Sequence, residues 1–165
     1  MSEYTSFETK RLFLKPTNEE DADFIFELMN TPKWIQFIGE RNVKSITSAK
    51  EYIKNKITPQ LKRLGYATYT LILKADQTKI GTCGLYDREG IEGLDIGFAF
   101  LPQYESQGYG FESADKLIQV AIQDFGVKEI KAITTKDNIA SQKLLEKLGL
   151  ILNGMTKLPD EDEEL

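Results

Sequence analysis

The segment 104-YESQGYGFESADKLIQVAIQDF-125 places two glycines, Gly108 and Gly110, directly before an amphipathic run. The run repeats apolar residues at helical spacing, which predicts a helix over 108–125 packed by one face on a sheet. The first turn of a helix carries N–H groups without acceptors and the positive end of the dipole. Glycines there expose the backbone to a phosphate-bearing ligand, although a tight turn that merely requires glycine explains the spacing equally well.

Two common nucleotide motifs fit this segment poorly. A P-loop requires G-x-x-x-x-G-K-[ST], which is absent from the chain. A dinucleotide fingerprint requires a third glycine and opens on the first strand, whereas here Ser113 takes the third position, late in the chain. The glycines therefore indicate a different kind of anion site or a structural turn.

The surrounding segments predict a single α/β domain over residues 1–165 with a mixed sheet. The consecutive strands before the glycines favour antiparallel pairing, and the strand–helix–strand unit around them favours a parallel crossover. The expected element order is β-α-α-β-β-β-α-β-α-β. Strands are predicted at 7–17, 66–74, 79–87, 94–101, 129–136 and 150–158. The strand 94–101 alternates apolar residues, with Leu94, Ile96 and Phe98 on one face and Asp95 facing away from them. Helices are predicted over 19–29 with Asn18 as the cap, from Thr47 or Ser48 to Leu64 with Gly65 as the stop, over 108–125, and from Asp137 or Asn138 to Leu148 with Gly149 as the stop.

Composition excludes several classes of chemistry. The chain has no histidine and one cysteine, Cys83, which removes Ser–His and Cys–His nucleophilic systems and most zinc sites, so no metal is expected. Cys83 lies in a strand-like stretch and is interpreted as an inert core thiol rather than a nucleophile. No apolar run approaches a membrane span and no signal core opens the chain, so we expect a cytoplasmic protein without a membrane partner.

Charge is unevenly placed along the chain. Of 26 acidic residues, five lie in the tail 160-DEDEEL-165, and the remainder balance the 21 lysines and arginines. The tail is interpreted as a solvated end. Because no basic stripe is present, we expect no nucleic-acid partner.

Three stretches together resemble the GNAT superfamily of acyl-CoA-dependent N-acyltransferases, and within it the ribosomal-protein N-terminal acetyltransferase type. They are 8-ETKRLFLKP-16, 95-DIGFAFLPQYESQGYGFESADKL-117 and 138-NIASQKLLEKLGL-150. The first matches a T-x-R-L-x-L-R opening, the second contains the pyrophosphate loop [RQ]-x-x-G-x-[GA], and the third matches N-x-x-S-x-x-x-x-E-K-x-G-F. The resemblance covers nearly the whole chain and implies a GNAT fold.

The resemblance implies acetyl-CoA as co-substrate, held where a strand and a helix splay apart. Backbone groups of Phe98 and Phe100 would bind the pantetheine arm, and residues 107–111 would surround the pyrophosphate with N–H groups. Asn138 would hydrogen-bond the pantetheine or the incoming substrate. The cofactor-binding residues implied are thus Phe98, Phe100, Gln107, Gly108, Tyr109, Gly110, Phe111 and Asn138.

The implied reaction transfers acetyl from the thioester to a primary amine, either a protein N-terminal α-amine or a small-molecule amine. Ser141 would lie near the sulfur and protonate the thiolate, with a plain first-turn serine as the alternative. Asp95 is the first candidate for the general base, with Glu92 and Asp87 as alternatives, and a solvated strand residue explains Asp95 equally well. An α-amine, with a pKa of about 7.7–8.0, needs only a weak base.

Three departures from the family pattern leave alternatives open. Glu105 replaces the usual Arg or Gln at the start of the loop, and Leu145 stands where many members place a tyrosine acid. The final family strand is expected to be absent, and the open sheet edge would favour a homodimer. A non-catalytic acyl-CoA-binding module is therefore the alternative function, and a nucleotide-binding domain is a third hypothesis.

Overall fold

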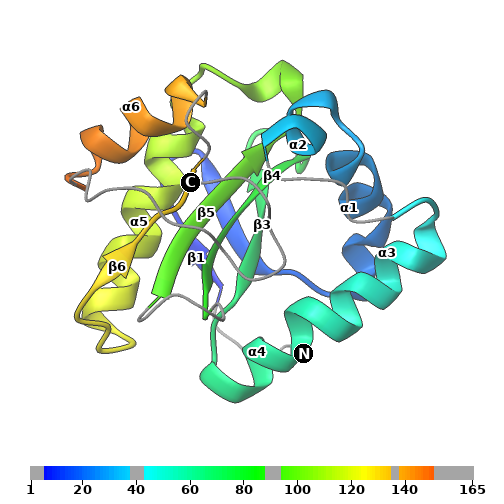
Figure 1. Cartoon of the computed structure of the whole chain (residues 1–165), viewed down its shortest axis with the longest axis horizontal. Helices are drawn as coiled ribbons and strands as arrows, with labels where there is room; N and C mark the ends of the chain where they lie inside the picture. The colour runs from blue at the N-terminus through cyan, green and yellow to red at the C-terminus, as the bar shows by residue number, and fades with distance from the viewer. Residues whose placement is uncertain (1–5, 38–42, 88–93, 135–137, 151–165) are drawn as a thin grey trace.

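A six-stranded mixed sheet forms the centre of the protein, in strand order β1-β2-β3-β4-β5-β6 (Figure 1). The computed structural model describes residues 6–37, 43–87, 94–134 and 138–150. Neighbouring strands are antiparallel except β5 and β6, which are parallel. This confirms the predicted mixed α/β sheet. The strands are β1 Phe7–Glu8, β2 Leu12–Pro16, β3 Thr68–Leu73, β4 Lys79–Tyr86, β5 Leu94–Phe100 and β6 Ile130–Lys131.

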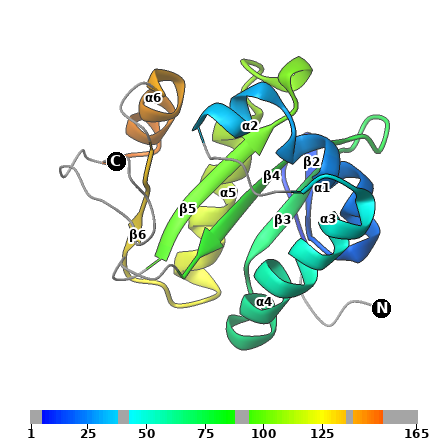
Figure 2. The ribbon, with the colours of Figure 1, turned by 45° about the vertical axis from the view of Figure 1, so that its right-hand side comes forward.

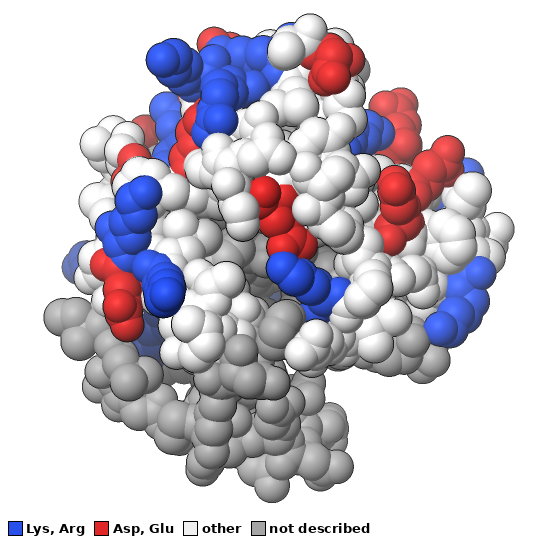
Figure 3. All heavy atoms as spheres, turned by 90° about the horizontal axis from the view of Figure 1, so that it is seen from above, with Lys and Arg blue, Asp and Glu red and all other residues white. Residues whose placement is uncertain are grey.

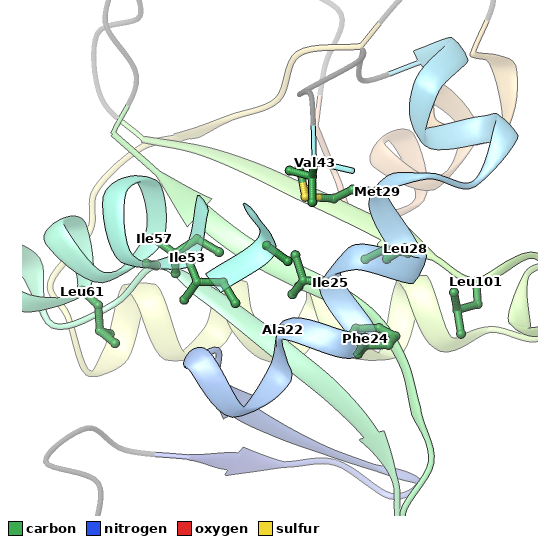
Figure 4. Close-up of a cluster of buried hydrophobic side chains, with 12 residues drawn as sticks. Ala22, Phe24, Ile25, Leu28, Met29, Val43, Ile53, Ile57, Leu61 and Leu101 are labelled. Carbon is green, nitrogen blue, oxygen red and sulfur yellow. The ribbon is translucent and has the colours of Figure 1, made fainter. Parts of the chain in front are cut away.

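The N-terminal helices cover one face of the sheet. Asn18 caps the 3-10 turn η1 (Glu19–Asp21) by accepting from the Glu20 N–H, as predicted for the start of this helical region. It leads into α1 (Ala22–Met29), followed by the short helix α2 (Pro32–Phe37). Apolar side chains of α1 and the next helices interdigitate over the sheet (Figure 4). This cluster includes Ala22, Phe24, Ile25, Leu28, Met29, Val43, Ile53, Ile57, Leu61 and Leu101.

The second helical region begins earlier than predicted. Ser45, rather than Thr47 or Ser48, is the N-cap of α3 (Ile46–Tyr52), because its hydroxyl accepts from the Ser48 N–H at 3.1 Å. A π-helical segment η2 (Ile53–Ile57) joins it to α4 (Thr58–Leu64), in which Pro59 lies in the first turn. The wider π turn accommodates a proline that would clash with the carbonyl four residues earlier in a continuous α-helix. Gly65 ends α4 with a positive φ of 88°, as predicted.

The long helix α5 (Tyr109–Gln123) crosses the opposite face of the sheet (Figure 2). Its buried residues Ala114, Leu117 and Ala121 follow the predicted apolar face. They pack against buried side chains of β2, β3, β4 and β5. Helix α5 is thereby fixed as a rigid element, and its first turn is held at the end of β5, after the 3-10 turn η3 (Pro102–Tyr104).

The predicted strand 129–136 is wrong in length, because β6 pairs with β5 only at Leu94↔Ile130 and Asp95↔Lys131. Beyond that pair the two segments diverge, so residues 132–134 leave the sheet while β5 continues to Phe100. The last described helix, α6 (Ile139–Lys147), is capped by Asn138, and Gly149 follows with φ 96°, both as predicted. Of the expected strand 150–158, only Leu150 is described, and it is not in a strand; residues 151–158 and the acidic tail lie outside the described residues.

Candidate active site

A cleft of about 830 Å³ lies beside the part of β5 from which β6 diverges. It is lined by β4, β5, the first turn of α5, residues 132–134 and the start of α6, together with residues of α1 to α4, which are called the far wall below. Nine of the ten predicted site residues line this cleft: Asp95, Phe98, Phe100, Gly108, Tyr109, Gly110, Phe111, Asn138 and Ser141. The sequence separated these residues by up to 46 positions, and the fold brings them to one surface.

Gln107 is the predicted residue that does not line the cleft. Its side chain is exposed and donates to the backbone oxygen of Gln103 at 2.8 Å. Its own backbone oxygen accepts from Arg11 Nη1 at 3.1 Å. The Gln107 side chain therefore stabilises the turn from outside, and only its backbone belongs to the glycine turn.

Within the described ranges, one edge of β5 beside the cleft is left without a partner strand beyond Asp95. Leu101 N–H donates to Ile80 O on β4 at 2.9 Å, and the β4–β5 register runs without a shift. Because backbone groups of successive residues alternate between the two edges of a strand, Phe98 and Phe100 direct their N–H and C=O groups away from β4. Among the described residues no strand pairs with this part of β5.

The first turn of α5 is built from a left-handed glycine and has no side-chain cap. Gly108 is the N-cap residue with φ 86°, a conformation in which side chains are strongly disfavoured. A Cβ at Gly110 would lie 2.8 Å from Leu144 Cδ2 of α6, so a hydrogen atom there allows α5 and α6 to approach closely. With no side chain accepting from the first N–H groups, this turn has the chemistry of an anion site.

Acidic side chains near the turn are each paired with a cation. Glu105, the departure noted in the loop pattern, forms an ion pair with Lys33 of α2. Glu112, in the first turn of α5, binds Arg11 Nε at 2.7 Å. The negative charges that would repel a phosphate are therefore largely offset. Basic and acidic residues also alternate over the face seen in Figure 3, in keeping with the balanced charge of the chain outside its tail.

Burial disfavours the charged form of Glu112, but hydrogen bonds from Thr9 and Arg11 outweigh it and hold the pKa of this carboxyl below its ordinary value of 4.5. A carboxyl with a lowered folded-state pKa stabilises the protein above its unfolded pKa, and this contribution disappears as pH falls through the folded value. We therefore expect the unfolding free energy of wild type to exceed that of Glu112→Gln by a margin that shrinks as pH is lowered from about 5 to about 3.

Chemical denaturation at a series of pH values measures this margin. Thr9→Val removes one hydrogen-bond donor to Glu112 and leaves both Arg11 contacts. The unfolding free energy of this variant should therefore keep part of the pH dependence that Glu112 gives to wild type. A margin between wild type and Glu112→Gln that stays constant from pH 5 to 3 would contradict the assignment.

Asp95 is buried, with 1% of its surface exposed, so the interpretation of a solvated strand residue is wrong. It lies on the face of β5 opposite to Ile96 and Phe98, as predicted, and next to Tyr86 of β4 across the strand pair. Tyr86 covers Gly84 and Gly97, where added Cβ atoms would lie 2.6 Å from its hydroxyl oxygen and 3.0 Å from its Cε2. Of the two alternative bases, Asp87 is exposed and pairs with Arg63 at 2.9 Å, and Glu92 lies outside the described residues.

Asn138 and Ser141 are joined at the start of α6. The Asn138 side-chain oxygen accepts from the Ser141 N–H at 3.3 Å and so caps the helix. This leaves the Ser141 hydroxyl in the cleft wall, one turn before Leu145, which also lines the cleft and packs against the core on the α5 side. Ser141 is thus one of the hydroxyl-bearing residues that line the cleft, together with Tyr109 and Thr134.

Sequence reasoning did not identify two cations near the turn. Lys33 and Glu105 are 72 residues apart, and no local pattern links them. Arg11 belongs to the recognised opening stretch, but its contact with Gln107 spans 96 residues and follows only from the packing of β2 beside α5. Trp34 lines the cleft and also packs against the apolar cluster of α1 and the helices that follow.

Cys83 is fully buried in β4, and burial raises the pKa of its thiol to about 12, despite an opposing hydrogen bond with Ser113. The structure thus supports an inert core thiol. We expect Ellman's reagent to label the folded protein at least about 100-fold more slowly than free cysteine at pH 8, with one thiol appearing in denaturant. Rapid labelling of the folded protein would show that Cys83 is accessible.

No group of three or more acidic or thiol side chains in the described parts of the chain is arranged to hold a metal ion. No helix within the same ranges combines the length and apolar character needed to cross a bilayer.

Comparison with known proteins identifies the family. The sequence model of the acetyltransferase (GNAT) domain matches residues 11–151, so the chain belongs to the GNAT acetyltransferase family, as the resemblance predicted. It is 25% identical to YoaA, an uncharacterised N-acetyltransferase of Bacillus subtilis, over 151 residues. The aligned region covers 91% of this chain and 85% of YoaA.

Solved structures of acetyltransferases share the fold. An acetyltransferase from Agrobacterium tumefaciens superimposes with a TM-score of 0.82 at 18% identity, over 99% of this chain and 93% of that one. RimL, a ribosomal L7/L12 alpha-N-protein acetyltransferase in complex with coenzyme A, gives a TM-score of 0.80 at 18% identity, over 97% and 94%.

Proposed function

We propose that this acetyltransferase moves an acetyl group from acetyl-CoA to a primary amine by direct attack in a ternary complex. The observation that carries the proposal is an edge of β5 that no described strand pairs with, beside a first turn of α5 that no described side chain caps, both lining one cleft. A pantetheine arm presents amides that can hydrogen-bond a strand edge, and a pyrophosphate suits a helix N-terminus with exposed N–H groups.

The residues of the cleft fit such a co-substrate. Phe98 and Phe100 offer backbone groups along the free edge, and Gly108 to Phe111 offer N–H groups at the turn. The left-handed Gly108, with φ 86°, sets the course of the turn, and the hydrogen atom at Gly110 lets α6 pack closely against α5. Asn138 uses its oxygen to cap α6, which leaves its amide N–H groups for the arm or the acceptor.

The proposed chemistry needs no covalent enzyme intermediate. The amine nitrogen attacks the thioester carbonyl, the new C–N bond forms, and the C–S bond breaks. Asp95 takes the proton lost by the amine, directly or through water, and Ser141 donates a hydrogen bond or a proton to the departing thiolate. The Phe98 N–H, directed to the open edge of β5, is placed to stabilise the oxyanion that develops on the carbonyl.

The acceptor is either a protein N-terminal α-amine or a small-molecule amine. An α-amine supports the simplest chemistry, because roughly a tenth or more of it is neutral near pH 7 and a single buried carboxylate is a sufficient base. The fold shared with RimL makes protein N-termini the first acceptors to test. The apolar residues Ile25, Met29 and Trp34 on the far wall offer contacts for an acceptor side chain.

Calorimetric titration with acetyl-CoA, with CoA and NAD as comparators, tests the first part of the proposal. Micromolar binding of acetyl-CoA and CoA but not NAD is the expected result. A panel of peptides and small amines, assayed by release of free thiol, then tests transfer. Binding without turnover over a broad panel would favour a non-catalytic acyl-CoA-binding module, and absence of acetyl-CoA binding would overturn the proposal.

A further inference from the structure

Arg11, just before β2, reaches across the molecule to the glycine turn and touches it at three points. Its Nη1 donates to Gln107 O at 3.1 Å, and its Nε donates to Glu112 Oε1 at 2.7 Å. Its guanidinium carbon lies 4.2 Å from the centre of the Tyr109 ring, in cation–π range. The turn and the first helical residues are therefore held by one rigid, planar group.

The contact with Gln107 fixes the direction of a peptide group. The bond between Gln107 and Gly108 is trans, so its C=O and N–H point in opposite directions. Because the carbonyl is directed to Arg11, the Gly108 N–H is directed away from Arg11. Arg11 also stands against the outer side of Gly108, where an added Cβ would lie 3.2 Å from Nη2.

The contact with Glu112 controls a charge that would otherwise oppose an anion. Glu112 lies in the first turn of α5, where its carboxylate would compete with a bound phosphate for the N-terminal N–H groups. Its Oε2 accepts from the Thr9 hydroxyl and, at 2.9 Å, from the Arg11 N–H, while Oε1 accepts from Arg11 Nε. The carboxylate is thus turned toward β2 and offset by a positive charge.

We propose that Arg11 is a positioning residue for the pyrophosphate of the co-substrate. It orients the Gln107–Gly108 peptide and holds Glu112 away from the site, and it acts through these groups. The inference rests on the proposed function, since it presumes that the turn binds the pyrophosphate. Two simpler roles compete with it: a tie that only stabilises the fold, and a point charge that attracts phosphate directly.

Dissociation constants for CoA and for pantetheine, which lacks the pyrophosphate, separate these roles. We expect Arg11→Ala to raise the Kd for CoA by about 10- to 100-fold and to leave the Kd for pantetheine, measured at millimolar concentration by ligand-observed NMR, unchanged. Arg11→Lys should lose nearly as much affinity for CoA, because one ammonium cannot span Gln107 O and Glu112 in the geometry of a guanidinium.

Lys74→Ala is the matched control. Lys74 also ties the N-terminal hairpin down, through Glu8 at 3.1 Å, but does not contact the glycine turn, so its loss should change the Kd for CoA by less than about twofold. Thermal unfolding of every variant reports the fold, and Arg11→Lys, which keeps the charge and the aliphatic stem, decides the question if Arg11→Ala does not fold.

Each unfavourable outcome overturns a different statement. If wild type does not bind CoA, the proposed function fails, and this inference with it. If wild type binds CoA and Arg11→Ala binds equally well, the inference fails while the proposed function stands. If Arg11→Ala loses affinity for CoA and pantetheine equally, Arg11 only stabilises the fold. If Arg11→Lys binds CoA with full affinity, Arg11 acts as a point charge that attracts the phosphate directly.

Discussion

Gly108→Val is expected to raise the Kd for acetyl-CoA by roughly 100-fold or more, about 2.7 kcal/mol of binding free energy. Gly108 has φ 86°, where a β-branched residue is strained, and its Cβ would lie 3.2 Å from Arg11 Nη2. The turn must therefore change its backbone or displace Arg11, and either change misdirects the N–H groups proposed to bind the pyrophosphate. Calorimetric titration of the folded variant measures the effect.

Gly126→Val is the matched control, because Gly126 lies just beyond the other end of α5 and also has a positive φ, 67°, with open space around it. It should lose comparable stability through strain and keep its affinity for acetyl-CoA within about twofold. Gly110 is a weaker test, since its nearest neighbour is the mobile end of Leu144. Equal affinities for Gly108→Val and Gly126→Val would remove the turn from the binding site.

Asp95→Asn is expected to lower kcat by about 10²- to 10⁴-fold, the usual contribution of a positioned general base. The change keeps the shape of a side chain that is 1% exposed and removes its capacity to accept a proton. The Kd for acetyl-CoA should change by less than about threefold, because the loss falls on the chemical step. Steady-state kinetics with the best amine from the panel, together with calorimetry, measure both quantities.

Asp87→Asn provides the comparison for this test. Asp87 lines the same cleft at the end of β4, but it is exposed and paired with Arg63, so its variant should keep kcat within about tenfold. A kcat for Asp95→Asn within threefold of wild type would exclude Asp95 as the base. Loss of acetyl-CoA binding in the same variant would instead assign it a structural role.

Local patterns predicted most of the elements. The apolar spacing of 108–125 identified α5, and the apolar alternation of 94–101 identified β5, because each sequence pattern repeats within its own segment. Caps at Asn18 and Asn138 and the stop at Gly65 followed from the preferences of single residues. The start of α3 was placed too late, because Ser45, Thr47 and Ser48 offer similar capping hydroxyls and only the packed helix selects among them.

Candidate site residues were predicted through motif order, and their roles remain to be tested. Nine of them share one cleft because β5, α5 and α6 are fixed against one another by the sheet and its cores. Gln107 was assigned to the loop through its backbone, and the structure shows that its side chain lies outside the cleft, which a loop motif alone does not reveal.

The sequence by itself determined the mixed α/β class, the position of the glycine turn at the mouth of a helix, and the exclusion of histidine-based chemistry, since all three depend on composition or short-range order. Only the tertiary structure decided that β6 leaves β5 after two residue pairs, that Lys33 offsets Glu105, and that Arg11 holds the turn. These features join segments far apart in the chain. The energies of these contacts depend on distances in space, and local sequence patterns carry no information about those distances.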